Sequence, residues 1–188
     1  VQTCALPIYT IDGGAGTDTM FVTNTAANTG SLGEAIVTNV EIFNVRATAG
    51  TSEFNAALVG GETDVNSYLS AGVLTITNLE SGADAGMTGN GTMTSGALNA
   101  GWAATVTSGV VNVVDVKVGG QITTSGTLLA TNTVNSTGSA NTIGALELGA
   151  AVTTLTIDAA TDLTTGAVTN TTAAALTSLT ITGAGKVV

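Results

Sequence analysis

Short runs of alternating apolar and polar residues recur along the chain, separated by Gly, Asn, Asp and Ser. Leu74-Thr75-Ile76-Thr77 shows the pattern most plainly, with an apolar side chain at every second position. A period of two residues is typical of a β-strand with one buried face. The pattern predicts strands over residues 19–23, 36–39, 42–46, 73–77, 110–118, 121–124, 142–148, 153–157 and 178–182.

The segment 51–71 is the part of the chain that least resembles strands. Its larger side chains, Phe54, Leu58, Tyr68 and Leu69, are spaced so that they line a short helix or cap a loop. We therefore expect a loop with a helical turn in this segment.

An internal repeat points to the architecture. Residues 150–157 read AAVTTLTI and residues 174–181 read AALTSLTI, so Leu155 and Leu179 are 179 − 155 = 24 residues apart. Periods of about 20–50 residues are typical of solenoids and related arrays. The fold class expected is all-β, a β-solenoid (parallel β-helix-like) repeat segment in which each rung packs on its neighbours. A β-sandwich built from similar hairpins is the alternative.

The composition fits a narrow fold. Hydrophobic residues make up 44% of the chain, but only 3% are aromatic and 9% are charged, so there are few large side chains to build a thick core. Disordered chains are poor in β-branched residues, whereas this chain is rich in Val, Ile and Thr, which favour strands. We expect an ordered chain that forms a thin core.

The charge balance restricts the partners. There are 13 acidic and 3 basic residues, for a net charge of −10. This argues against binding to nucleic acid, which is bound by Lys and Arg, and equally against binding to anionic membrane surfaces. No apolar run reaches the roughly 18–20 residues of a membrane span. Cys4 is the sole cysteine, so disulfides cannot hold the chain together. These features predict an extracellular or bacterial cell-surface protein.

Residues 1–8 (VQTCALPI) look like the in-frame translation of a common short-read sequencing adapter, with a genuine N-terminal strand as the alternative. They contain both Cys4 and Pro7, the only residues of those types in the chain. Apart from residues 1–8, we divide the sequence into 9–60, a calcium turn with the first β-repeats, and 61–188, Thr/Ala/Gly/Val-rich β-repeats of the same solenoid.

One motif indicates specific chemistry. Residues 13–21 (GGAGTDTMF) match the nonapeptide pattern G-G-x-G-x-D-x-U-x of calcium-binding β-helices, where U is apolar. Gly14 and Gly16 permit a tight turn with positive φ, and Asp18 supplies a carboxylate for Ca²⁺, which prefers six to eight oxygen ligands. Asp12 adds charge nearby. A Gly-rich turn that Asp18 merely caps is the alternative.

With this motif, residues 11–57 resemble the repeat region of bacterial surface-layer (S-layer) proteins and of RTX-type adhesins secreted by type I systems. The segments TNVEIFNV (38–45) and EFNA (53–56) also carry the resemblance. It implies a β-solenoid, structural calcium at Gly14, Gly16 and Asp18, and self-assembly into a lattice or stalk at the cell surface. The chain departs from the RTX pattern because its nonapeptide is not repeated in tandem.

Enzyme chemistry finds little support. There is no His, so Ser-His-Asp and Cys-His arrangements and a His-bearing zinc site are excluded. Carboxylate pairs of the glycosidase type remain, at residues 62 and 64, 80 and 84, and 158 and 162. Trp102 is either a sugar-stacking platform or a core residue, and Gly119-Gly120 suggests a hairpin turn.

We predict a structural protein and no enzyme: a repeat segment of a bacterial surface layer assembled with calcium. The alternative is an adhesin or carbohydrate-binding module on a β-solenoid stalk, which binds cell-surface polysaccharide through a loop such as 80–101.

Overall fold

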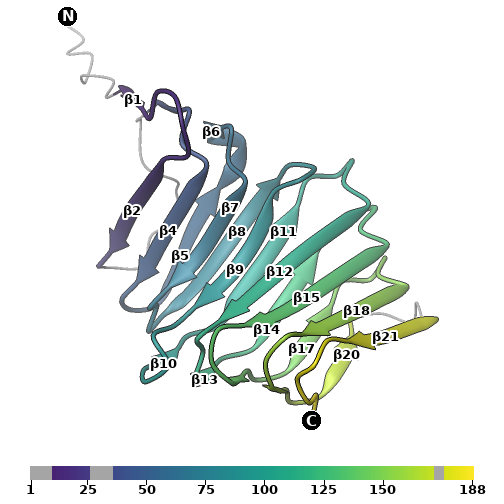
Figure 1. Cartoon of the computed structure of the whole chain (residues 1–188). Coiled ribbons are helices and arrows are strands. Elements are labelled where there is room, and N and C mark those ends of the chain that lie inside the picture. Colours follow the sequence, from purple (N-terminus) through teal and green to yellow (C-terminus); the bar gives the residue numbers. More distant parts are fainter. Residues whose placement is uncertain (1–9, 26–35, 172–175) are drawn as a thin grey trace, which may run out of the picture.

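In the computed structural model, which describes residues 10–25, 36–171 and 176–188, every described strand pairing is parallel (Figure 1). The chain winds through successive rungs, and six of these rungs contribute one strand to each of two long sheets. This confirms the predicted β-solenoid in preference to a sandwich, because a sandwich of hairpins would pair its strands antiparallel. Residues 1–8 lie outside the described residues.

The larger sheet has eight strands, whose order in the sheet follows their order in the chain. The strands are β2 (Thr19–Asn24), β4 (Ile42–Ala47), β7 (Asp64–Tyr68), β9 (Asp84–Thr88), β12 (Ser108–Val114), β15 (Thr131–Thr137), β18 (Thr154–Ala159) and β21 (Ser178–Thr182).

The second sheet has six strands and forms the other wall. The strands are β5 (Thr51–Asn55), β8 (Val73–Leu79), β11 (Leu98–Trp102), β14 (Ile122–Ser125), β17 (Leu146–Leu148) and β20 (Val168–Asn170). Short strands pair at the corners: β1 (Thr10–Asp12) with β3 (Ile36–Thr38) and β6 (Val59–Gly60), β10 (Thr94–Ser95) with β13 (Val118–Gly119), and β16 (Asn141–Thr142) with β19 (Leu163–Thr164). A 3-10 turn, η1, covers Ala56–Leu58.

The register sets the length of each rung. Leu155 pairs with Leu179, which confirms the 24-residue repeat. Other rungs differ: Thr19 pairs with Ile42, 23 residues on, and Asp64 pairs with Asp84, 20 residues on. These differences in length are taken up mainly at the corners, but the pairing of β8 with β11 also shifts register, between Ala100 and Trp102.

Inward-pointing side chains stack into continuous columns between the two sheets. One column runs through every strand of the eight-stranded sheet: Met20, Phe43, Val65, Ala85, Val111, Val134, Ile157 and Ile181. The six members from Phe43 to Ile157 are buried. The core is therefore a narrow stack in which each apolar side chain contacts the same position of the next rung, as the scarcity of large residues predicts.

A stack of glycines forms the corner that precedes the six-stranded sheet. Gly72, Gly96, Gly120 and Gly144 recur every 24 residues, and Gly166 follows after 22. The amide N–H of Gly144 donates to the carbonyl of Gly120 at 3.0 Å, and the N–H of Gly166 donates to that of Gly144 at 3.0 Å. A Cβ on Gly96 would lie 1.9 Å from the carbonyl oxygen of Gly72. The backbones thus approach too closely for any side chain.

Outward-pointing polar side chains form ladders across the rungs of the eight-stranded sheet. The amide of Asn135 donates to Asn112 Oδ1 at 2.8 Å, and the amide of Asn112 donates to Asp84 Oδ2 at 3.0 Å. At the far end of this column Thr182 donates to Asp158 Oδ1 at 3.1 Å. These bonds add side-chain pairing between rungs to the backbone hydrogen bonds of the sheet.

The structure corrects three expectations. The segment 51–71 is not a loop: it contains β5, β6 and β7, and only its helical turn appears, as η1. The predicted strands 110–118 and 142–148 are each broken by a corner, so β12 ends at Val114 and residues 142–148 divide into β16 and β17. Gly119-Gly120 is a corner between parallel strands and no hairpin, because β13 and β14 each pair with strands of other rungs.

Candidate functional site

The Gly-rich turn at residues 13–18 joins β1 to β2 and is longer than the turn that stacks beneath it. Asp12 pairs with Thr38 and Thr19 pairs with Ile42, so six residues of this turn face three of the next rung (18 − 12 against 41 − 38). Gly14 and Gly16 have φ values of 89° and 125°, as the motif predicts. The three additional residues therefore extend the turn beyond the corner.

Asp18 and Glu41 lie together at the base of this turn. The amide N–H of Asp18 donates to Glu41 Oε2 at 2.8 Å, and the N–H of Ile42 donates to the carbonyl of Asp18 at 3.0 Å. Asp18 Oδ2 is buried and accepts no hydrogen bond from any of the described residues. A buried carboxylate oxygen without a donor is destabilising unless a cation or water satisfies it. Sequence reasoning missed Glu41, although it directly precedes a strand just as Asp18 does.

Asp12 makes a separate set of contacts. Its Oδ1 accepts from the Asn39 amide at 2.8 Å and from the Gly14 backbone N–H at 3.1 Å. These bonds, chiefly the one from Asn39, lower the pKa of the Asp12 carboxyl below its ordinary value. Asp12 thus stabilises the start of the turn, and its carboxylate already accepts two hydrogen bonds.

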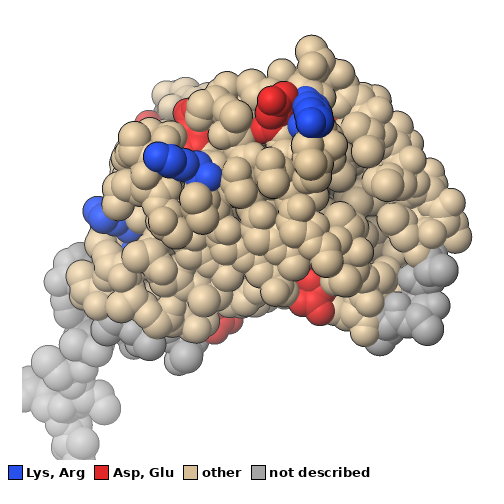
Figure 2. Space-filling view, turned by 90° about the horizontal axis from the view of Figure 1, so that it is seen from below, with Lys and Arg blue, Asp and Glu red and all other residues tan. Residues whose placement is uncertain are grey.

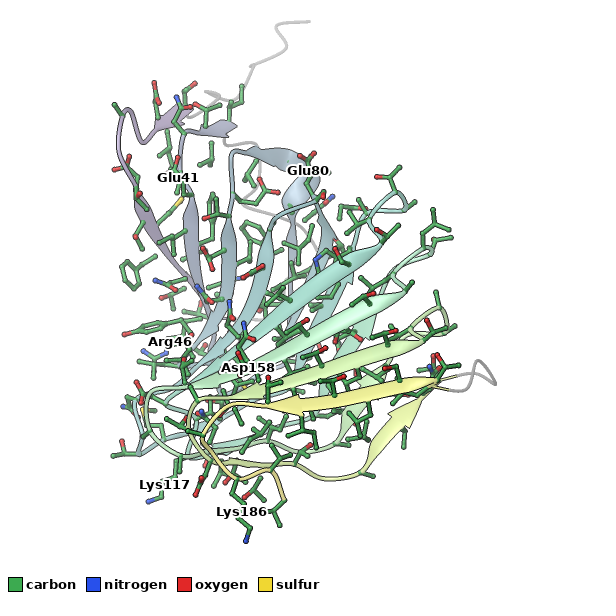
Figure 3. The ribbon with its side chains drawn as sticks, turned by 45° about the vertical axis from the view of Figure 1, so that its right-hand side comes forward. Glu41, Arg46, Glu80, Lys117, Asp158 and Lys186 are labelled. Atoms are coloured by element: carbon green, nitrogen blue, oxygen red, sulfur yellow. The ribbon has the colours of Figure 1, made fainter. Side chains whose placement is uncertain are left out.

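Further acids occupy the same corner of the following rungs, and together with Asp18 and Glu41 we call them the acidic corner. Its other members are Glu62, Asp64, Glu80 and Asp84. Glu41 and Glu80 lie toward one edge of the solenoid, while Arg46, Lys117 and Lys186 lie toward the opposite edge (Figure 3). The negative charge of the first rungs is therefore concentrated along one edge.

Stacking of the rungs gives these carboxylates neighbours that differ from the ones next to them in the sequence. Asp64 pairs with Asp84 across neighbouring strands, and Glu62 interacts with Glu80. Burial, reinforced by the charge of Glu80, raises the pKa of Glu62. Its Oε1 is buried and has no hydrogen-bond partner in the described part of the chain. Burial also raises the pKa of Asp84, and its bond from Asn112 partly offsets this. Stacking thus brings like charges together between rungs.

The oxygen atoms at the turn are compatible with binding of a hard cation, but few of them belong to side chains. Within residues 10–25, 36–171 and 176–188, no group of three or more Asp, Glu, His or Cys side chains is arranged to hold a metal. Calcium at this turn would use the carboxylates of Asp18 and Glu41 and complete its shell with backbone carbonyls and water. Gly14 and Gly16 would contribute through their backbone, since they have no side chain.

The two other features that the sequence suggested for ligand binding are structural. Trp102 ends β11 with its side chain buried, and its Nε1 donates to the carbonyl of Ala83 at 3.2 Å. It is a core residue and no sugar platform. The segment 80–101 contains β9, β10 and most of β11, so much of the expected binding loop belongs to the walls of the solenoid.

Comparisons of the chain with protein-family models, with curated proteins and with solved structures give no match. In the described part of the chain, no helix has the length and apolar character needed to cross a membrane. What the molecule itself defines is a class of architecture, a parallel β-solenoid with an acidic corner.

We expect Asp18→Asn to remove stabilisation by calcium. At about 10 mM Ca²⁺ and a dissociation constant of about 10⁻³ M, typical of weak extracellular sites, binding to the folded state adds about 1.4 kcal/mol to the free energy of unfolding. Thermal melts with Ca²⁺ and with EDTA measure this gain in the original chain and in the variant. Asp158→Asn, at an exposed carboxylate of β18 several rungs away, is the matched control and should keep the gain. Identical responses to Ca²⁺ in all three proteins would contradict the site.

Proposed function

We propose that this chain is a structural repeat segment of an extracellular bacterial surface layer, and that it associates end to end in the presence of calcium. The observation that carries the proposal is the apolar last rung. Leu179 and Ile181 of β21 stack directly on Leu155 and Ile157 of β18, yet 54% of each remains exposed. They continue the core columns, and a further rung, from a longer chain or from a second copy, would cover them.

The backbone of the last rung favours the same contact. β21 is the final strand of the eight-stranded sheet, and β2 is the first. Edge strands carry unpaired N–H and C=O groups that template pairing with another chain. Contact between the β21 end of one copy and the β2 end of the next is heterologous, and such contacts generate open filaments or rings.

The surface offers little electrostatic opposition to association. Figure 2 shows that the face seen from below is mostly uncharged, with only a few Lys, Arg, Asp and Glu side chains on it. The net charge of −10 nevertheless repels a second copy at low salt. A divalent cation that binds or bridges carboxylates of the acidic corner reduces this repulsion more than Na⁺ at equal ionic strength.

The test compares Ca²⁺ with Na⁺ at equal ionic strength by light scattering, followed by electron microscopy of any assembled product. We expect Ca²⁺ to promote filaments or ordered arrays. Ile181→Lys places a charge in the apolar column and should prevent assembly, because a buried charge without a partner is strongly unfavourable. Thr180→Lys, one residue earlier, points outward on the same strand and should assemble normally.

A chain that stays monomeric at every Ca²⁺ concentration would refute the assembly role. Equal loss of assembly in Ile181→Lys and Thr180→Lys would also refute it, since the contact would then depend on charge alone and not on the apolar column.

A further inference from the structure

The outer face of the eight-stranded sheet carries two neighbouring aromatic side chains. The chain has six aromatic residues, and five of them lie in the described ranges. Phe43, Phe54 and Trp102 are buried in the core. The other two, Phe21 and Tyr68, contact each other, with ring centroids 5.5 Å apart and planes inclined at 74°. Exposed apolar side chains that lie together, unlike isolated ones, are candidates for a binding surface.

The alternation of the strands directs these rings outward. In β2, Met20 and Val22 pack against the core, whereas Phe21 between them is 64% exposed. In β7, Val65 and Ser67 are buried, and Tyr68 follows on the outer face, half-buried. The strand β4 lies between β2 and β7, so the two side chains meet across it. Their position is set by the sheet and requires no loop.

Amide side chains lie beside the rings. Phe21 pairs with Asn44, which pairs with Asn66. Asn112 and Asn135 of the same column bond to each other, but within the described ranges no hydrogen bond involves the side chain of Asn44 or Asn66. Gly86, next in the column, has no Cβ, and a Cβ there would lie 1.9 Å from Asn66 Oδ1. The absence of a side chain at residue 86 thus leaves room for the Asn66 amide.

Arg46 adds a cation to the same face. It lies two residues after Asn44 on β4 and is exposed. Among the described residues it forms no ion pair, although acids outnumber bases 13 to 3 in the chain. We call Phe21, Asn44, Arg46, Asn66 and Tyr68 the aromatic platform. It combines apolar rings with amides and a guanidinium that have no partner among the described residues.

We propose that the aromatic platform binds a pyranose glycan. The C–H face of a pyranose ring packs on aromatic side chains, whose ring faces are electron-rich. Each Asn amide offers two donors and an acceptor oxygen to sugar hydroxyls, and Arg46 can donate to hydroxyls or form a bidentate pair with a uronic acid carboxylate. An open sheet face suits a polymer chain lying across it, since a small ligand requires an enclosing pocket. This role goes beyond assembly.

The test uses an array of immobilised pyranose oligosaccharides, neutral and uronic acid-containing, probed with the whole chain carrying Ile181→Lys so that self-association does not contribute. We expect retention on at least one class, and about tenfold weaker binding, or about 1.4 kcal/mol, in Phe21→Ala and in Tyr68→Ala. Phe21→Tyr keeps a ring and should keep binding. Leu128→Ala, which truncates another exposed apolar residue away from the aromatic platform, should have no effect.

Arg46→Ala with Lys117→Ala as its control separates the two classes of glycan. Loss that is confined to uronic acid-containing oligosaccharides assigns Arg46 to the carboxylate, and equal loss on both classes assigns it to hydroxyls. Absence of retention on every oligosaccharide would overturn the proposal. So would equal retention by the original chain, Phe21→Ala and Tyr68→Ala when all three melt at the same temperature. Neither result depends on whether the chain assembles with calcium.

Discussion

Replacing Trp102 by alanine is expected to lower the free energy of unfolding by roughly 3–5 kcal/mol, the usual range for a buried Trp truncated in a core. The indole is 5% exposed and lies against Gly109, where a Cβ would come 2.5 Å from Cε2. Because a Gly is required at residue 109 to admit the ring, no neighbouring side chain there can fill the resulting cavity. Denaturant unfolding followed by circular dichroism measures the loss.

Two companion variants make the Trp102 result specific. Trp102→Phe keeps most of the apolar contact but removes the hydrogen bond to the Ala83 carbonyl. We expect the missing hydrogen bond to lower the free energy of unfolding by about 1 kcal/mol, in addition to the loss caused by the change in packing. Leu128→Ala, at a side chain that is 54% exposed, should change stability little. A small loss in Trp102→Ala, comparable to that in Leu128→Ala, would show that the indole is not a core residue. Trp fluorescence should also be unaffected by any glycan that binds the aromatic platform.

Gly96→Ala is expected to destabilise the solenoid by roughly 2–3 kcal/mol, because the added methyl group overpacks a corner made of backbone. A Cβ at residue 96 would lie 1.9 Å from the Gly72 oxygen and 2.7 Å from its carbonyl carbon. Neither atom belongs to a flexible side chain, so two rungs must separate to admit the methyl group. The amide of Gly96 also donates to the Ser70 carbonyl, and that bond would be strained.

The matched control for Gly96→Ala is Gly60→Ala. A Cβ at residue 60 would meet no atom within 4 Å, so the same change should leave the melting temperature nearly unaltered or raise it slightly through a less flexible unfolded chain. Equal stability of the two variants would contradict the interpretation of the glycine stack. The comparison separates the effect of the close approach of the rungs on stability from the general effect of replacing a glycine by alanine.

Strand positions were largely predictable because alternation is a local signal. Residues 19–23, 42–46, 73–77 and 178–182 were expected as strands and are strands. The segment 51–71 was misread because its apolar side chains are sparse, and its strands are specified by pairing with the neighbouring rungs, such as Phe54 with Ile76. The 24-residue recurrence of Gly72, Gly96, Gly120 and Gly144 was present in the sequence and would have located a corner of every rung it spans.

The candidate functional sites were less predictable from the sequence than the strands, because they depend on the tertiary structure. The glycines of the turn at 13–18 have the predicted positive φ, but the position of Glu41 beside Asp18 follows from rung stacking. The carboxylates likewise pair between rungs, Asp64 with Asp84, because residues about one rung apart become neighbours. Spacing in the sequence could not show this while the length of each rung was unknown.

The all-β class, the narrow repeating core and the 24-residue period follow from the amino-acid sequence alone, since alternation, composition and repetition are visible without knowing which residues meet. Which side chains stack on one another depends on the folded arrangement of the rungs. Rungs differ in length, from 20 residues between Asp64 and Asp84 to 26 between Ala85 and Val111. The number of residues between stacked positions therefore changes from rung to rung, and it is set by the corners and by backbone pairing. That register buries Trp102, exposes Phe21 and brings Phe21 to Tyr68.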